Sequence, residues 1–454
     1  MDTDFHFYGT GTAALNAGFN LKQANLIANA AEYVDFFNSD FWSNWNIKDN
    51  TNIVQAITYP QLTCQTIGAK MAVDYNSDLW NAFHFPPGNL SHSQASNINS
   101  YEWEQNFKSR LKIRSTASSL SNAEVPKLCR PYSVFALDMA KDSINKFREL
   151  NDGKNDLTTL INTYTGNSGN YSVDDREKLA LILLGIRMHV FADTWAHQDF
   201  TGEASKNING AGTLNSVYAS EKDSNVLSLT DWTGTAWALH SDTDCAAAPA
   251  FIPGSSACRG HGQVGHFPDY SWLSYIYPAA WHPSNGYILR NNPTEYNEAW
   301  SWLSTVMASC LGIKTASSKV SDNPLKTNSN TGGQSQKLTI PADINDAICK
   351  KHTLDNTKLS AVFESEKTWQ STELGKKFKL NERWNNNKCV FTEPMYKSLG
   401  LIDGLAQTRY GNINVEANST LHYMQLAADI HYKWCQKWAE EHPEFKWQPA
   451  AIKK

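Results

Sequence analysis

The spacing of apolar residues along the chain predicts a mostly helical protein. Residues 172–198 begin with acidic residues, continue into strong helix formers, and carry apolar side chains on nearly every face of the expected helix. A helix that is apolar all round is typical of a protein interior, so we expect this segment to be buried, with Ser172 as its N-cap. The same periodicity indicates two helices in residues 11–37, on either side of residues 18–20, and further helices at residues 130–151, 294–312 and 415–442.

Alternation of apolar and polar residues, which is typical of β-strands, is scarce, and the best stretch, near residues 335–341, is short. Residues 203–262 have the composition of a long loop, and residues 314–337 that of a linker. We therefore predict a mostly α fold with long loops. Its expected parts are a first domain at residues 1–313, a flexible linker or loop at residues 314–341, and an additional C-terminal helical segment of unknown role at residues 342–454.

Three polar residues interrupt the central apolar helix at intervals of four: His189, Asp193 and His197. In a helix each such step rotates the side chain by only ~40° and lifts it by ~6 Å, so the three share one stripe. Buried imidazole and carboxylate groups need partners. Two interpretations remain open: the three residues hydrogen-bond to one another and to the backbone, or they bind a metal ion, for which imidazole and carboxylate are suitable ligands.

Further histidines and aspartates lie in short motifs elsewhere in the chain. Neighbouring glycines let the backbone approach a ligand closely, and prolines stiffen a loop. Taken one at a time, each residue has an ordinary explanation as a solvated helix end, a surface loop residue or an internal hydrogen-bond partner. These candidates are Asp4 and His6 in DFHFYGT, Asp35 in EYVDFF, His84 in NAFHFPPG, and His261, His266 and Asp269 in RGHGQVGHFPDYSW.

Composition and charge narrow the classes of function. Hydrophobic content of 41% and charged content of 19% are ordinary for a globular protein. The 45 acidic and 40 basic residues give a net charge of −5, and no basic stripe stands out, so nucleic acid is not expected as a long charged ligand. No apolar run reaches the length expected of a transmembrane helix. The eight cysteines contain no CxxC pair, which argues against a zinc ribbon; free thiols are expected, with Cys245 and Cys258 as the one pair placed to form a bridge.

The order of the candidate residues, together with the motifs FHFYGT, MHVFADTWAHQDF and GHGQVGHFPD, resembles the zinc-dependent phospholipase C and P1 nuclease superfamily. More narrowly, it is similar to the bacterial zinc metallophospholipases C of the Pseudomonas–Legionella type. The resemblance covers about residues 4–300. It implies a multi-helix phospholipase C/P1 nuclease-like core that holds two or three Zn²⁺ ions. The implied metal ligands are Asp4, His6, Asp35, His84, His189, Asp193, His197, His266 and Asp269.

The sequence departs from the pattern of that superfamily in three places. The interval between Asp193 and His197 is shorter than usual, and the acid after His266 is an aspartate three residues on, where a glutamate one turn later is usual. In the superfamily the amino terminus is itself a zinc ligand. Because MDTDFHFYGT is acidic and polar and does not read as a secretory signal peptide, we expect Asp4 to take the place of a free amino terminus.

The resemblance also implies an activity, the hydrolysis of the glycerol-side phosphodiester of phospholipids to diacylglycerol and a phosphorylated headgroup. Zinc would neutralise the phosphate oxygens and lower the pKa of a bound water towards ~7. Asp35 and Asp193 are the expected catalytic residues, Asp35 by orienting the attacking water and Asp193 by bridging ions. Asp199 and His261 are expected to support the ligands from behind. The aromatic residues expected to line the substrate site are Tyr8, Phe85, Trp195, Phe267 and Tyr270.

Two other functions and two locations stay open. One alternative is a P1-type nuclease that uses the same metal chemistry to cleave single-stranded nucleic acid. The other is a non-catalytic interaction protein, in which the metals are structural or absent. The expected partner is a phospholipid at a membrane surface, contacted without a transmembrane segment. In the absence of a signal peptide the expected locations are the cytoplasm or, by a signal-peptide-independent route, a host cell, as for type IV secretion effectors that act in virulence.

Overall fold

The structure is a computed structural model of the 454-residue chain. It is mostly helical, which confirms the predicted fold class. The residues that it describes are 1–37, 44–58, 60–64, 73–89, 120–121, 123–171, 173–211, 218–220, 237–239, 259–282, 287–312, 338, 340–352, 358–378 and 413–449.

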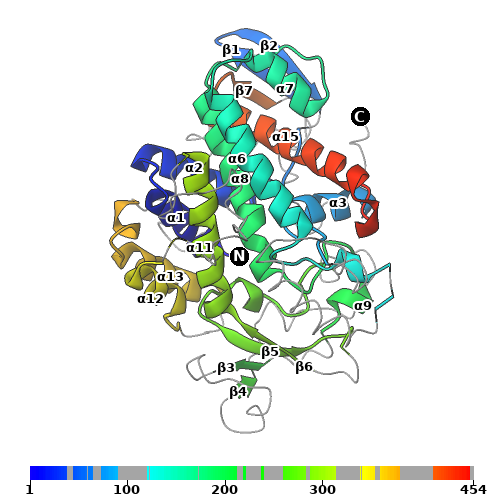
Figure 1. The fold of residues 1–454 in the computed structure, drawn as a ribbon, viewed down its shortest axis with the longest axis vertical. Helices are drawn as coiled ribbons and strands as arrows, with labels where there is room; N and C mark the ends of the chain where they lie inside the picture. Colours follow the sequence, from blue (N-terminus) through cyan, green and yellow to red (C-terminus); the bar gives the residue numbers. More distant parts are fainter. Residues whose placement is uncertain are drawn as a thin grey trace, which may run out of the picture.

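The central element is helix α8, Arg176–Ala196, which runs through the middle of the protein (Figure 1). Its N-cap is Asp175, whose side chain accepts a hydrogen bond from the backbone N–H of Lys178; the expected cap, Ser172, lies outside the described residues. Every residue from Leu179 to Ala196 is buried, as the all-round apolar pattern predicts. By length and composition α8 is also apolar enough to cross a membrane, but core helices pass the same test, and the apolar stretch of this one is enclosed by the protein.

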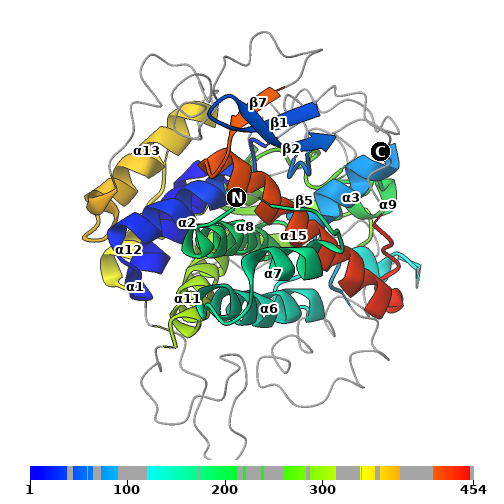
Figure 2. The same cartoon turned by 90° about the horizontal axis from the view of Figure 1, so that it is seen from above.

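Four long helices pack against α8 and surround it when the molecule is viewed from above (Figure 2). They confirm the helices predicted from periodicity: α2 (Leu21–Tyr33), α6 (Val134–Asn151), α11 (Asn292–Cys310) and α15 (Thr420–Glu441), with α1 (Thr10–Asn16) as the first of the pair expected in residues 11–37. The shorter helices are α3 (Val73–Phe83), α7 (Leu157–Thr165), α9 (Lys206–Asn209), α12 (Ala342–Cys349) and α13 (Lys358–Ser371). Single turns are the π-helical η1 (Asp4–Gly9) and the 3₁₀ turns η3 (Val125–Lys127), η7 (Phe267–Asp269), η9 (Gly375–Lys377) and η12 (Pro443–Phe445).

Two small sheets lie near opposite ends of α8 (Figure 1). In the first, β1 (Asn44–Asp49) pairs antiparallel with β2 (Asn52–Thr58) and parallel with β7 (Ile413–Glu416). In the second, the strand order is β4 (Trp237–Leu239), β3 (Tyr218–Ser220), β5 (Ser274–Pro278) and β6 (Tyr287–Asn291), all antiparallel. The stretch near residues 335–341, where a strand was expected, falls largely outside the described residues.

Helices from the C-terminal part of the chain belong to the same hydrophobic core as the N-terminal helices. Ile344 of α12, Trp369 of α13 and Leu421 of α15 are fully buried in the core that also contains α2 and α8. Strand β7 pairs with β1 across more than 360 positions of sequence. Within the described residues, the part after residue 341 is therefore packed with the first 313 residues, and most of the expected linker between them, and both Cys245 and Cys258, lie outside these ranges.

Helices α2 and α8 approach so closely that only glycine fits at one point of contact. A Cβ added to Gly185 of α8 would lie 2.5 Å from the carbonyl oxygen of Ile27 and 2.7 Å from Cβ of Ala30, both on α2. Atoms at such distances overlap, so a side chain here would push α2 away. This contact matters for the site described below, because the carbonyl of Ala31 on α2 is hydrogen-bonded to Nδ1 of His189 on α8.

We expect Gly185→Ala to lower the free energy of unfolding by about 1–3 kcal/mol, because the added methyl group overpacks this helix contact. Gly169→Ala is the matched control, since its Cβ would meet Tyr171 at an ordinary 3.5 Å. Urea unfolding followed by circular dichroism gives both values. Equal stability of the two variants would contradict the close packing of α2 on α8.

A buried histidine in α15 is expected to make the protein sensitive to acid. Burial and the nearby Arg187 lower the pKa of His431 to about 3, against the bond that its Nε2 donates to the carbonyl of Ala82. In the unfolded chain His431 would take up a proton near pH 6.5. Its contribution to stability is thus fully present above pH 6.5 and is lost as the pH falls towards 3.

We therefore expect His431→Gln to reduce the dependence of stability on pH. The free energy of unfolding is measured for metal-free protein at pH 7 and pH 5. Wild type should lose more stability than the variant between the two values. A variant with the same or a larger loss would show that His431 is not held neutral.

Candidate metal centre

The histidines and aspartates singled out from the sequence converge beside the C-terminal half of α8. His189 and Asp193 lie on the helix, and His197 is its C-cap. The other side chains come from four separate segments: His6 from η1, Asp35 from the turn after α2, His84 from the end of α3, and His261 and Asp269 from the segment that ends in η7. Residues as far apart in sequence as His6 and Asp269 are thus brought together around one helix.

The side chains form three groups whose potential ligand atoms all lie within 4.8 Å of one another. Group A is His6, His189 and Asp193; group B is Asp35, His84 and His189; group C is His197, His261 and Asp269.

Asp193 connects the three groups. Its Oδ1 lies 3.2 Å from Nε2 of His6, and its Oδ2 lies 3.1 Å from Nε2 of His189 and 3.4 Å from Nδ1 of His84. The same Oδ2 lies 3.5 Å from Nδ1 of His197. The four-residue spacing predicted that His189, Asp193 and His197 share one face of the helix. In the structure the three groups lie next to one another at this face.

Backbone carbonyls fix the orientation of four of the imidazoles. Nδ1 of His189 is 2.8 Å from the carbonyl of Ala31, and Nδ1 of His197 is 2.8 Å from the carbonyl of His84. Nε2 of His84 is 3.0 Å from the carbonyl of Thr63, and Nδ1 of His261 is 2.7 Å from that of Gly265. Since a carbonyl only accepts, the proton of each neutral ring sits on this outer nitrogen, and the inner nitrogen presents a lone pair.

The inner nitrogens of neighbouring rings lie close together, and a cation placed between them would accept both lone pairs. Nε2 of His189 lies 3.2 Å from Nδ1 of His84. His6 stacks on His189 with 3.7 Å between ring centroids, and neither of its ring nitrogens makes a hydrogen bond, although the side chain is fully buried. Paired lone pairs and orphaned buried nitrogens are costly unless a metal ion lies between them, so these residues fit a metal cluster.

The charge states also suit metal binding. Burial lowers the pKa of His6 and His84, and that of His261 to about 4, so these imidazoles are neutral near pH 7. Burial opposes ionisation of Asp193 and Asp269, but nearby histidines and the amino group of Met1 hold the pKa of both carboxyls well below its usual range. Metal ligands must be neutral imidazoles and ionised carboxylates, which is the combination found at these five residues.

The amino group of Met1 lies in the cluster, where Asp4 was expected. Its nitrogen is 2.9 Å from Oδ1 of Asp193, 3.1 Å from Oδ1 of Asp269 and 3.2 Å from Nε2 of His197. Burial disfavours its charge, but the surrounding carboxylates outweigh this effect and raise its pKa to about 11. A metal ion bound there would displace that proton and gain an amine ligand.

Asp4 instead points away from the three groups and accepts a hydrogen bond of 2.5 Å from the hydroxyl of Ser365 on α13. Burial raises its pKa to about 8. The reason is geometric: in the helical turn η1, residues two apart project to nearly opposite sides, so His6 faces the cluster and Asp4 faces α13. The expectation that Asp4 replaces the amino terminus was therefore wrong.

The roles of His261 and His266 are the reverse of those predicted from the sequence. His261, expected behind the ligands, belongs to group C, and its Nε2 is 3.5 Å from Oδ1 of Asp269. His266, expected as a ligand, lies beside the group, with Nδ1 3.5 Å from Oδ2 of Asp269 and 26% of its side chain exposed. Gly260 and Gly265 both have positive φ, and the tight turn between them folds His261 back onto Asp269.

Asp199, which was expected to support a ligand from behind, is paired with arginines. It forms an ion pair with Arg130 and lies 3.9 Å from NH1 of Arg290. Backbone carbonyls, which carry no sequence signal, hold the imidazoles in its place.

The aromatic residues expected to line a substrate site are buried. Phe85 stacks on His197 with 4.3 Å between centroids, so it supports a group C imidazole. Trp195 packs edge-on against Tyr132 and Phe191. Each of the five has an exposed fraction of at most 2%: Tyr8, Phe85, Trp195, Phe267 and Tyr270.

One family comparison bears on this chain. The model of a protein family of unknown function, DUF6765, matches residues 1–437. The chain belongs to the DUF6765 family. No curated protein and no solved structure matches it. The match spans the N-terminal motif, the central helix, the group C segment and α13, so in DUF6765 the part after residue 341 belongs to the same family unit as the cluster.

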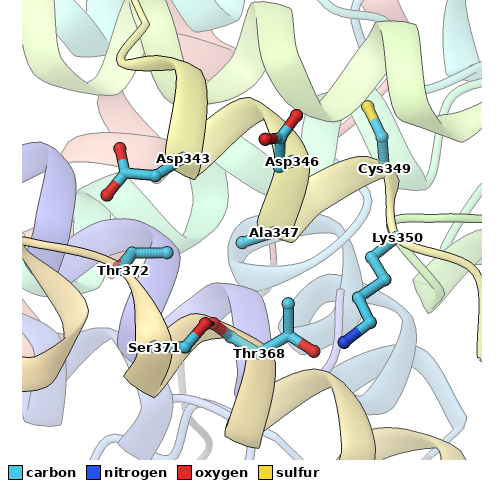
Figure 3. Close-up of a pocket in the computed structure, with 8 residues that line it drawn as sticks. All are labelled: Asp343, Asp346, Ala347, Cys349, Lys350, Thr368, Ser371 and Thr372. Atoms are coloured by element: carbon cyan, nitrogen blue, oxygen red, sulfur yellow. Dashed lines mark hydrogen bonds between the residues drawn. The ribbon is translucent and has the colours of Figure 1, made fainter.

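A separate hollow of about 500 Å³ lies between α12 and α13 of this DUF6765 chain (Figure 3). Lys350 and Ala347 point across it towards Thr368, whereas Asp346 and Cys349 point the other way. The hydroxyls of Thr368 and Ser371 already donate to backbone carbonyls of their own helix. Its polar groups do not converge on one point, in contrast to those of groups A, B and C.

We expect the purified DUF6765 chain to bind zinc, with ions in groups A, B and C. His189→Ala removes a ligand shared by groups A and B, so it should lose more zinc than His261→Ala, which affects group C alone. His442→Ala is the control, because this histidine stacks on Trp438 outside the cluster. Zinc per chain is counted by mass spectrometry after dialysis against dilute zinc, and identical counts in all four proteins would contradict the assignment.

Proposed function

We propose that this protein is a zinc-dependent phosphodiesterase, and more narrowly a phospholipase C that hydrolyses the glycerol-side phosphodiester of phospholipids of the phosphatidylcholine type. The observation that carries the proposal is the convergence of groups A, B and C on the single carboxylate of Asp193. Clusters of adjacent ions suit the in-line displacement of a phosphoester, because both the attacking and the leaving oxygen need charge stabilisation. The motif resemblance to zinc metallophospholipases C adds the substrate class.

The donor count favours a catalytic over a structural role for the metal. A structural zinc site is closed by four protein ligands, whereas catalytic zinc keeps a position for water or substrate. Among the described residues, each group supplies three side-chain donors. The amino group of Met1 lies between Asp193 of group A and Asp269 of group C and can complete only one of these sites, which leaves the others with room for substrate oxygens.

Asp35 is the residue that we assign to the attacking water. Its side chain is 31% exposed, more than that of any other residue in the three groups, so it lies where the cluster opens to solvent. Its Oδ1 is 3.6 Å from Nδ1 of His84 and 3.8 Å from Nε2 of His189. Burial and the neighbouring Asp193 raise the pKa of its carboxyl, against His189 and His84, and a more basic carboxylate accepts a proton more readily.

The chemistry divides between the ions and the chain. Bound zinc would neutralise the non-bridging phosphate oxygens and lower the pKa of water towards ~7. Asp35 orients that water and takes its proton. Asp193 is fully buried, and its carboxylate holds the three groups next to one another. The overall charge of −5 favours a phospholipid over a long polyanion such as nucleic acid.

We expect zinc-loaded protein to release phosphocholine from phosphatidylcholine vesicles and to lose that activity on chelation. Asp35→Asn should lower the rate by about 10²-fold or more, since it removes the proton acceptor. Asp343→Asn, in the hollow between α12 and α13, is the control and should leave the rate unchanged.

Single-stranded DNA is assayed in parallel under the same conditions. Digestion of DNA without release of phosphocholine would replace the phospholipase by a nuclease. Neither activity in protein that retains its zinc would contradict the hydrolase altogether.

A further inference from the structure

The C-terminus of α8 ends against a buried arginine. Arg290 of β6 is 1% exposed, and its guanidinium donates hydrogen bonds to three carbonyls where α8 stops: NH2 to Trp195 at 2.8 Å and to Ala196 at 3.2 Å, and NH1 to Gln198 at 2.9 Å. The last carbonyls of a helix have no partner within the helix, and positive charge near them is favourable. The guanidinium fork supplies several fixed donors at once, which a single ammonium group does not.

The backbone just after this point is bent. Asp199 has φ of +84°, a left-handed conformation that non-glycine residues rarely adopt. The bend is held on two sides: Arg130 and Arg290 flank the Asp199 carboxylate, and the backbone of Cys129 bonds to both Asp199 and Phe200. Such a conformation persists only where its surroundings fix it.

His197 lies two residues before this bend, at the C-cap of α8. Its Nε2 lies 3.3 Å from Oδ1 of Asp269. Its other nitrogen reaches the carbonyl of His84, and Phe85 stacks on the ring. Arg290 thus holds backbone carbonyls on both sides of His197: those of Trp195 and Ala196 before it and that of Gln198 after it.

The other half of group C is held from a neighbouring position. Asn292, two residues after Arg290 and fully buried, donates from Nδ2 to the carbonyls of Phe267 and Tyr270, each at 2.8 Å. These carbonyls flank Asp269 in η7. One short stretch of chain, from β6 into α11, therefore holds both the His197 turn and the Asp269 turn.

We propose that Arg290 is a positioning residue for group C, acting through the carbonyls of residues 195–198 to aim His197 at Asp269. The inference rests on the metal centre of the proposed function. Arg290 has no part in groups A and B, whose ligands lie earlier on α8 or on other segments. Its loss should therefore release the group C ion alone.

The test counts zinc in Arg290→Met and compares it with Arg187→Met. Arg187 is also a fully buried arginine of the core, but it pairs with Asp142 of α6 at 2.7 Å, away from the cluster. Both variants should be less stable than wild type. Arg290→Met should bind one zinc ion fewer per chain, whereas Arg187→Met should keep the wild-type count.

Arg290→Lys covers the case in which Arg290→Met does not fold. It keeps the positive charge but not the fork, so the group C ion should be held about 10- to 100-fold less tightly in a chelator competition. Cobalt-substituted protein gives a second readout, since the visible spectrum of the group C ion should change in Arg290→Lys and stay as in wild type in Arg187→Met.

Full zinc content and affinity in both Arg290 variants would overturn the inference, whatever the protein hydrolyses. A wild-type chain that binds zinc without cleaving phospholipid would remove the proposed function but leave this inference standing, because the readout is bound metal.

Discussion

The structure depends on the electrostatics of one buried cluster. Eight imidazole and carboxylate side chains point their acceptor atoms at one another beside α8, at depths where most of them are shielded from water. In a protein interior such groups repel and cost free energy unless positive charge lies among them. The amino group of Met1 supplies part of that charge, and divalent cations supply the rest in our interpretation. The surrounding fold is built to keep these acceptors together.

Helix α8 can position these side chains because its neighbours fix both its packing and its C-terminal end. The Gly185 contact with α2 sets the distance over which the Ala31 carbonyl reaches His189. At the C-terminal end of the helix, Arg290 fixes the turn that carries His197. One ligand is thus positioned by close helix packing and another by termination of the helix. Apolar periodicity is enough to form a buried helix. To position ligands on that helix, the sequence must also determine how the helix packs against its neighbours and where it ends.

The sequence predicts what local spacing determines and misses what only tertiary contact determines. The four-residue register of His189, Asp193 and His197 follows from helical geometry, and His6, Asp35 and His84 were found by their motifs. Met1, the reversed roles of His261 and His266, and the supporting carbonyls depend on turns and distant backbone, which have no period. The strand β1 did leave a signal: Trp45 and Ile47 alternate with polar residues and are buried, but the stretch is short and its partner β7 lies far along the chain.

The central claim is tested most directly by anomalous diffraction at the zinc absorption edge from crystals of the zinc-soaked protein. We predict separate peaks in groups A, B and C, each within about 2.0–2.2 Å of its histidine nitrogens and carboxylate oxygens. Peaks that lie outside the cluster, or an absence of peaks at zinc concentrations that saturate the protein in solution, would contradict a metal centre built around Asp193.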